Sequence, residues 1–257
     1  MDDQAAKRAP KTGGRRSTEE TRQAILRAAK KEFSQQGYSG ARIDKIARIA
    51  KCNVRMIYHY FSSKQKLYVA VLEEAYSDLR AREGNLQIDI DNPLDGLLEL
   101  LRFTFDYFEK NPSFEGILRA ENVMRGRFVR RSARVVEMGF PLRKTISDLI
   151  ASGERQGVLR ADLDPVHLYV TIAALSRFHL SSAFSLSAVM GTDMTRAEWR
   201  KSRWNHAAEV FRAYLLPPGA DSGAPEAAPQ REPVVRTPRR PRAPKPPAVV
   251  HTAAQSG

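Results

Sequence analysis

A short stretch near the start of the chain carries side chains suited to reading the edges of base pairs. Arg55 can donate two hydrogen bonds to a guanine, and Asn53 can contact a base or cap a helix. Val54 and Met56 can pack against a thymine methyl group. These four consecutive residues predict a site that reads sequence in the major groove of duplex DNA.

A second set of polar side chains surrounds this stretch and suits phosphate groups rather than bases. Tyr58 and Tyr60 offer hydroxyl donors, and Lys64 offers an ammonium group. Arg42, just before the preceding helix, can supply a further phosphate contact. Such contacts position a protein on DNA but carry little sequence information.

The elements that must hold these side chains are two short helices after a longer one. The long helix starts at a capping box formed by Ser17 and Glu20 and is expected to stop at Gly37. The short helices cover residues 43–50 and about 53–60. This is the pattern of a helix-turn-helix, whose second helix enters the major groove. Cys52, in the turn, is interpreted as a small buried apolar residue rather than a redox sensor.

Three runs of residues in this segment resemble the DNA-binding head of TetR-type repressors. They are Gly37-Tyr38-Ser39-Gly40, Ile43-Asp44-Lys45-Ile46-Ala47 and Ile57-Tyr58-His59-Tyr60-Phe61-Ser62-Ser63-Lys64. The resemblance implies a homodimer of all-α subunits, a ligand pocket in the C-terminal helices, and DNA binding that the ligand relieves. The C-terminal part more loosely resembles the RutR-like branch of this family, which includes pyrimidine-responsive regulators. The runs that carry this looser resemblance are Gly157-Val158-Leu159 and Asp164-Pro165-Val166-His167-Leu168.

Two positions depart from the family pattern. Lys51 stands where the family usually has a glycine in the turn, so we expect a non-glycine residue at positive φ there. Arg42 stands where a threonine commonly starts the second helix, which removes the usual hydroxyl cap and puts its phosphate contact in question.

The charge of the chain is concentrated in its first quarter and at its ends. The 257 residues carry a formal net charge of +13. Residues 17–67 hold eleven basic and four acidic side chains, whereas residues 68–216 hold twenty of each. This distribution favours a polyanion-binding head joined to a body with another role. A solvated basic surface without a partner is the alternative interpretation.

Several classes of protein are disfavoured by what the sequence lacks. A single cysteine excludes a disulfide framework or a cysteine-rich zinc module, and the histidines have no metal-ligand spacing. We therefore expect no metal and no cofactor. No apolar N-terminal segment indicates a signal peptide, and the apolar stretch 165–192 contains Arg177, so a buried helix is favoured over a membrane span. We expect a cytoplasmic protein without a membrane partner.

The chain is predicted to be all-α, with four parts. We expect a disordered basic arm, a helix-turn-helix domain (the head), a helical effector-binding and dimerisation domain (the body), and a disordered Pro-rich basic tail. Their ranges are 1–16, 17–64, 65–216 and 217–257. In the body a helix capped by Ser62 and Ser63 comes first, and Pro141 should kink a later one. The other helices are expected over 93–110, 112–125, 128–156, 165–190 and 194–216.

The body offers candidates for a ligand pocket and for a dimer interface. Apolar side chains of the central helices could form the pocket wall, and polar ones could anchor a ligand, although any single position is more often plain core or surface. The wall candidates are Phe103, Tyr107, Phe114, Met124, Phe128 and Phe178, and the anchor candidates are Arg119, Glu121, Asn122, Arg177 and His179. Helices near 165–190 and 195–216 are expected to form a four-helix interface. Its apolar candidates are Leu168, Ile172, Leu175, Leu180, Phe184 and Ala188.

These features predict a ligand-responsive transcriptional regulator, and a repressor in preference to an activator. A homodimer would bind a palindromic operator in duplex DNA, and an unidentified small-molecule effector would release it. The alternative is a nucleoid-type protein that binds DNA without sequence choice through its basic arm and tail. An enzyme on a helical scaffold is disfavoured, because no nucleophile motif, phosphate-binding glycine loop or paired carboxylate points to one.

Overall fold

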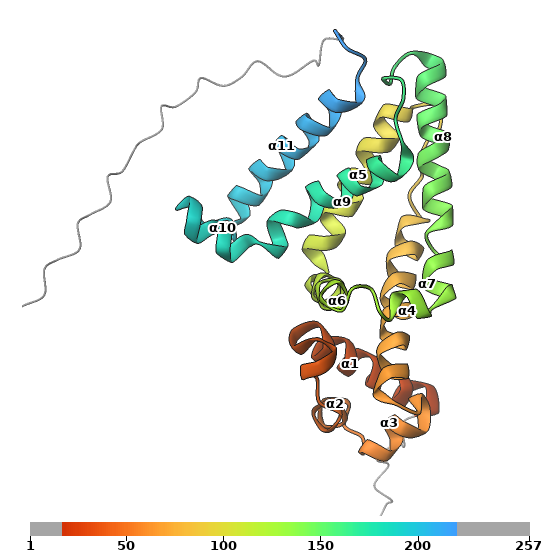
Figure 1. Cartoon of the computed structure of the whole chain (residues 1–257), viewed down its shortest axis with the longest axis vertical. Coiled ribbons are helices and arrows are strands. Elements are labelled where there is room, and N and C mark those ends of the chain that lie inside the picture. Colours follow the sequence, from red (N-terminus) through yellow and green to blue (C-terminus); the bar gives the residue numbers. More distant parts are fainter. Residues whose placement is uncertain (1–16, 220–257) are drawn as a thin grey trace, which may run out of the picture. The chain divides into compact units, whose positions relative to one another are not determined.

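A computed structural model describes residues 17–219 of the chain, and every regular element in that range is helical (Figure 1). The prediction of an all-α protein is therefore confirmed for this range. The basic arm 1–16 and residues 220–257 of the Pro-rich tail lie outside the described residues, so the predictions of disorder there stay predictions.

Four helices build the DNA-binding end of the chain. They are α1 (Thr18–Gly40), α2 (Ile43–Ala50), α3 (Val54–Phe61) and α4 (Lys64–Glu83). The predicted capping box is present: the Ser17 hydroxyl accepts a bond from the N–H of Glu20, whose carboxylate accepts from the N–H of Ser17. Gly37 breaks α1 with a φ of 65°, a conformation that glycine adopts without strain. Ser63 caps α4 as expected, accepting from the N–H of Lys66.

The remaining elements make up the body. They are α5 (Pro93–Lys110), α6 (Pro112–Val123), the 3-10 helix η1 (Val129–Arg131), α7 (Ala133–Glu137), α8 (Phe140–Gln156), α9 (Pro165–Ser181), α10 (Ala183–Met190) and α11 (Ala197–Leu215). Leucine and isoleucine side chains of α5, α8 and α9 pack with Phe211 and Leu215 of α11 into one apolar core. Burial of these side chains is what holds the amphipathic helices together.

The prediction of one kinked helix over 128–156 was wrong. The chain instead forms η1, α7 and α8, because Ser132 ends the 3-10 helix and caps α7 by accepting a bond from the N–H of Val135. Pro141 lies in the first turn of α8, where a residue without an N–H costs no hydrogen bond. Pro141 therefore begins a helix and does not kink one.

The expected continuous helix over 165–190 is also divided. It ends at Ser181, and Ser182, with a φ of −114° and a ψ of 8°, separates α9 from α10. The apolar composition continues through the break, so hydrophobic periodicity alone could not reveal it.

Helices α1 and α6 cross at a very short distance. A Cβ atom added to Gly116 of α6 would lie 2.4 Å from the carbonyl oxygen of Ser34 in α1. Ile117 of α6 and Phe128 extend from the body into the same buried cluster as Phe33 and Tyr68. The hydrophobic core under the DNA-binding helices is therefore completed by residues of the body.

The Gly116→Ala variant should be destabilised by about 1–3 kcal/mol, because the added methyl group would meet backbone rather than a movable side chain. Urea unfolding of the full chain measures this. The matched control is Gly40→Ala, whose new Cβ would lie at an ordinary 3.5 Å from the Cβ of Gln36. Equal unfolding midpoints for the two variants would show that the contact between α1 and α6 is not as tight as described.

Candidate nucleic-acid interface

The turn between α2 and α3 has the backbone that the sequence predicted. Lys51 adopts a left-handed conformation, with a φ of 55° and a ψ of 45°, so the expected non-glycine residue at positive φ is confirmed. The N–H of Cys52 bonds to the carbonyl oxygen of Ala47 at 3.0 Å, which closes the turn. Cys52 itself is half-buried against the buried cluster that contains Phe33 and Tyr68, which we call the head core.

The start of α3 presents only part of the predicted reading set to solvent. The side-chain oxygen of Asn53 accepts a bond from the N–H of Met56 at 2.9 Å, so Asn53 caps the helix. Met56 packs partly against the head core. Val54 and Arg55 are exposed. These two exposed side chains take part neither in the helix cap nor in the core packing.

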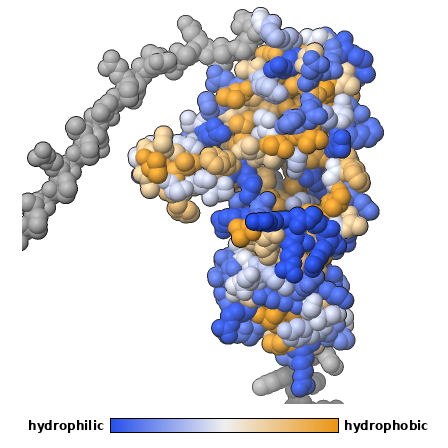
Figure 2. Space-filling view, viewed as in Figure 1, coloured by the Kyte–Doolittle hydropathy of each residue, from blue (hydrophilic) through white to orange (hydrophobic). Residues whose placement is uncertain are grey.

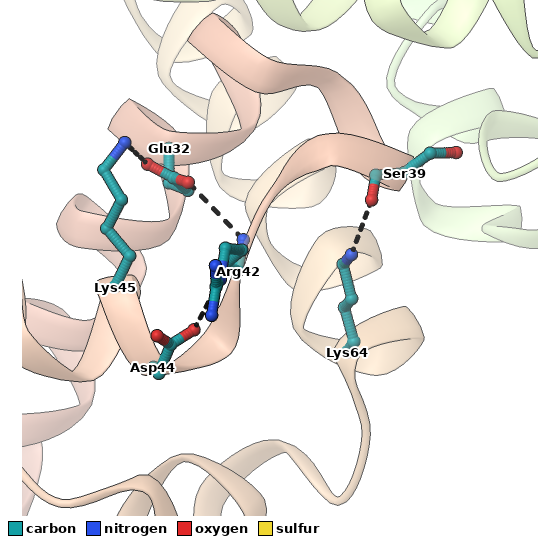
Figure 3. Close-up of polar contacts among 6 residues, drawn as sticks. All are labelled: Glu32, Ser39, Arg42, Asp44, Lys45 and Lys64. Atoms are coloured by element: carbon teal, nitrogen blue, oxygen red, sulfur yellow. Dashed lines mark hydrogen bonds and ion pairs between the residues drawn. The ribbon is translucent and has the colours of Figure 1, made fainter.

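The predicted phosphate-binding side chains differ in how exposed they are and in what they contact. Tyr58 is exposed, whereas Tyr60 is half-buried and packs against the head core. The Nζ atom of Lys64 donates a bond to the carbonyl oxygen of Ser39 at 3.4 Å (Figure 3). The same atom lies 5.0 Å from the centre of the Tyr38 ring. Partial burial lowers the pKa of Lys64. An ammonium group has three donors, so Lys64 can hold Ser39 and still donate to a phosphate oxygen.

A buried carboxylate ties α2 to α1 (Figure 3). Glu32 of α1 is 1% exposed, and its Oε2 atom lies 2.7 Å from the Nζ of Lys45 in α2. Its Oε1 atom accepts a bond from the backbone N–H of Arg42 at 3.4 Å. The Arg42 side chain forms no helix cap and pairs with Asp44 at 3.2 Å. Arg42 therefore uses its backbone N–H for the fold, while its guanidinium group is exposed beside Asp44.

The predicted pocket residues do not line one cavity. Phe103 and Tyr107 border a hollow on α5, where the Tyr107 hydroxyl donates to Asp78 at 2.9 Å. Arg119 and Asn122 are exposed on α6, and the Phe178 side chain is 58% exposed. These candidates are therefore dispersed over the surface and the core.

The other candidates already have structural roles. Arg177 forms an ion pair with the buried carboxylate of Glu115, and Phe114 packs on Tyr107. The Oε1 atom of Glu121 accepts bonds from the N–H groups of Phe128 and Val129 at 2.6 and 3.0 Å, and Met124 packs beside them against the head core. Each of these contacts contributes to the fold.

His179 is 3% exposed and stacks on Phe105, with ring centres 4.8 Å apart. Burial, reinforced by the charge of Arg203, lowers the pKa of His179 to about 4. The imidazole is therefore neutral in the folded protein near neutral pH.

A different cavity lies in the body, between α4, α8 and α9. Its volume is about 330 Å³, within the range of small-molecule sites. Ten residues line it, namely Tyr76, Arg80, Val135, Gly139, Leu142, Arg143, Ile146, Pro165, Val166 and Tyr169. None of them was among the predicted pocket residues, because side chains from four separate segments converge here and no local motif marks them.

Hydrogen-bond donors dominate the polar part of this cavity. Arg80 forms an ion pair with Glu83 and donates to the Tyr169 hydroxyl at 3.3 Å. The buried Nε atom of Arg80 has no partner among the described residues. Burial raises the pKa of Tyr76 to about 12, so this hydroxyl stays protonated. The lining includes two arginines and two tyrosines but no carboxylate.

Two other kinds of site are not found in the part of the chain that the structure describes. Over residues 17–219, no three His, Cys, Asp or Glu side chains are grouped so that they could hold a metal ion. Among the same residues, no helix is both long and apolar enough to cross a bilayer.

The recognition helix, its turn and its ties to α1 define a DNA-binding protein of the helix-turn-helix class. Residues 25–71 match the model of "Bacterial regulatory proteins, tetR family", and residues 93–210 match "Tetracyclin repressor-like, C-terminal domain". The chain belongs to the TetR family of transcriptional regulators.

Known relatives support this assignment along most of the described chain. Over 194 residues the chain is 37% identical to the HTH-type transcriptional repressor NicS of Pseudomonas putida, which covers 74% of this chain and 92% of that protein. It is 29% identical over 191 residues to the HTH-type transcriptional regulator RutR of Escherichia coli K12, covering 72% and 87%. These relatives are regulators of transcription and not enzymes.

Solved structures show the same fold at low sequence identity. The transcriptional regulator SCO4942 of Streptomyces coelicolor aligns with a TM-score of 0.57 at 23% identity, covering 76% of this chain and 98% of that one. A TetR transcriptional regulator from Chloroflexus aurantiacus also gives 0.57, at 22% identity, with coverages of 77% and 97%.

The pKa of His179 predicts how folding depends on pH. The unfolded chain takes up this proton near pH 6.5 and the folded chain only near pH 4, so stability is lost as the pH falls between these values. The His179→Phe variant should lose less of its melting temperature over this window than the parent chain. His59→Gln, which changes an exposed histidine of α3, is the control and should behave like the parent. Parallel curves for all three proteins would contradict the burial effect.

Proposed function

We propose that this chain is a ligand-responsive repressor that binds an approximately palindromic operator as a homodimer. The observation that carries this is the start of α3, where Val54 and Arg55 are exposed beside the Asn53 cap. The ion pair between Glu32 and Lys45 supports this proposal, because it fixes α2, on which α3 packs. Such a protein acts in the cytoplasm, where its DNA lies.

Exposed apolar side chains on α9 and α11 support dimerisation through these helices. Leu168 and Ile172 were expected to face a partner, but both are buried in the protomer's own core. Apolar side chains on other faces of the two helices are exposed instead. They are Val170 and Phe178 on α9 and Val210 and Tyr214 on α11. Two copies of these faces would form a four-helix interface that holds two heads about one helical turn of DNA apart.

The effector is proposed to bind in the cavity beside Arg80. Tyr76 and Arg80 lie on α4, the helix that continues directly from the DNA-binding end, so a ligand there contacts the element that positions the head. Because the lining offers donors and no carboxylate, the effector should combine an apolar body with hydrogen-bond acceptors. The dimer is expected to have two conformations that differ in the distance between its heads. The effector lowers DNA affinity by the factor by which it prefers the conformation whose heads do not fit the operator.

Two substitutions separate base reading from phosphate binding. Arg55→Ala should relax the preference for one base in each half-site, with a loss of about tenfold or more on the best operator and little change on random duplex. Lys64→Ala should weaken binding to all sequences alike and reduce the salt slope by about one.

The measurement is titration of labelled duplexes selected from a random pool, repeated at several salt concentrations. Equal losses for Arg55→Ala on selected and random duplexes would remove Arg55 from base reading. Deleting residues 217–257 provides a further check, since a protein that binds through its tail would lose most of its affinity, whereas a repressor would keep its operator preference.

A substitution at the edge of the cavity tests whether the effector binds there. Val166 is 47% exposed and lines the cavity, so Val166→Trp can fill the space without disturbing the deepest packing. DNA binding should persist, while release by an effector found in a small-molecule screen should need at least about tenfold more ligand. Val136→Trp, at an exposed position of α7 outside the lining, is the control. An unchanged response in Val166→Trp would place the effector elsewhere.

A further inference from the structure

A dense group of arginines lies between α6 and α7, in the body and outside the recognition helix. Arg125, Arg127, Arg130 and Arg131 occupy four of the seven positions 125–131, which contain no acidic residue. All four side chains are exposed, and no ion pair among the described residues includes any of them. We call these four residues the arginine loop. The nearby Arg134 is not included, because it borders a cleft that also contains Glu73 and Glu74.

The backbone of the arginine loop is firmly held. Arg125 and Gly126 both have positive φ, at 57° and 67°, and the N–H of Gly126 bonds to the carbonyl oxygen of Glu121 at 2.9 Å. The buried carboxylate of Glu121 accepts hydrogen bonds from the backbone N–H groups of Phe128 and Val129. The loop therefore has a fixed shape on which its side chains are displayed.

Contacts within the loop hold three of its four arginine side chains. Phe128 is 1% exposed, and the guanidinium carbons of Arg127 and Arg131 lie 5.4 and 5.9 Å from the centre of its ring. Arg130 donates a hydrogen bond to the carbonyl oxygen of Arg125. The loop thus carries four positive charges within seven residues, and an anion bound among them would relieve their mutual repulsion.

The net charge of the whole body does not reveal the local excess of positive charge in the arginine loop. Residues 68–216 hold equal numbers of basic and acidic side chains, so the excess at 125–131 is matched by acidic groups elsewhere. Figure 2 shows strongly hydrophilic side chains gathered across the middle of the visible face. A surface with this charge density suits a polyanion better than a single small anion.

The arginine loop is attached to the head but lies away from its DNA-reading edge. Phe128 packs against Tyr38 of α1 and Tyr68 of α4, with ring centres 4.6 and 5.0 Å apart. α6, which leads into the loop, packs on α1, whereas α3 packs on α2 and α4 (Figure 1). A duplex in contact with the start of α3 is therefore separated from the loop by the width of α1.

We propose that the arginine loop binds the phosphate backbone of a second DNA duplex, so that one protein molecule can join two DNA segments. Guanidinium groups form paired hydrogen bonds with phosphate oxygens, and four of them on a fixed loop can contact several phosphates of one backbone. A protein that already binds an operator also meets the surrounding chromosome at high local concentration, which favours DNA over an acidic protein as the partner. The inference goes beyond repression, since reading the operator does not require it.

A two-step capture experiment tests this. The full-length protein is loaded on an immobilised duplex selected for tight binding from a random pool, washed, and offered a second, fluorescent duplex of random sequence at about 100 mM salt. The parent protein should capture the second duplex. A variant carrying Arg125→Gln, Arg127→Gln, Arg130→Gln and Arg131→Gln should stay on the first duplex but capture at least about tenfold less of the second.

A control variant with the same loss of charge separates a local effect from a general one. It carries Lys110→Gln, Lys144→Gln, Arg155→Gln and Lys201→Gln, four exposed positions of the body outside the arginine loop. It should capture the second duplex nearly as well as the parent protein. Replacing the four arginines by lysine should restore part of the capture, because the charge returns without the paired hydrogen bonds.

Three results would overturn the inference. The first is retention on the immobilised duplex without capture of a second one by the parent protein, and the second is equal capture by the glutamine variant. The third is displacement of the second duplex by poly-glutamate as effectively as by DNA of equal charge, which would assign the surface to an acidic protein. Failure to bind even the first duplex would instead contradict the proposed function, so the two failures are distinguishable.

Discussion

The crossing of α1 and α6 at Gly116 is the constraint on which the rest of the structure depends. At that position the two helices touch through backbone atoms, so neither can rotate against the other without losing the contact. The same crossing allows Ile117 and Phe128 to enter the core beneath the DNA-binding helices. A change of shape in the body must therefore reach the recognition helix through α1 as well as through α4.

Two buried carboxylates stabilise the ends of this assembly by accepting bonds that the backbone could not otherwise make. Glu32 satisfies the N–H of Arg42 and pairs with Lys45, which fixes the start of α2. Glu121 accepts hydrogen bonds from the N–H groups of Phe128 and Val129, which do not donate to a helix carbonyl. Burying a charge is costly unless it is well bonded, and in both places the bonds formed hold an irregular segment in one conformation.

The head was predictable from sequence because its signals are local. The capping box at Ser17, the cap at Asn53 and the strained turn at Lys51 each involve residues within a few positions of one another. The cavity beside Arg80 was not predictable, since Tyr76 and Tyr169 are brought together only by the packing of distant helices. The helix breaks at Ser132 and Ser182 were missed because hydrophobic periodicity does not reveal a change of backbone conformation at one residue.

The position of Phe128 has a consequence for how the chain folds. Its ring packs against both Tyr38 and Tyr68, yet it lies more than fifty residues beyond the head in the sequence. A fragment ending after α4 would leave those two aromatic faces in contact with water and would lack the side chain that covers them. The recognition helix and the helices of the body should thus unfold together in one cooperative transition, although the sequence assigns them to two domains.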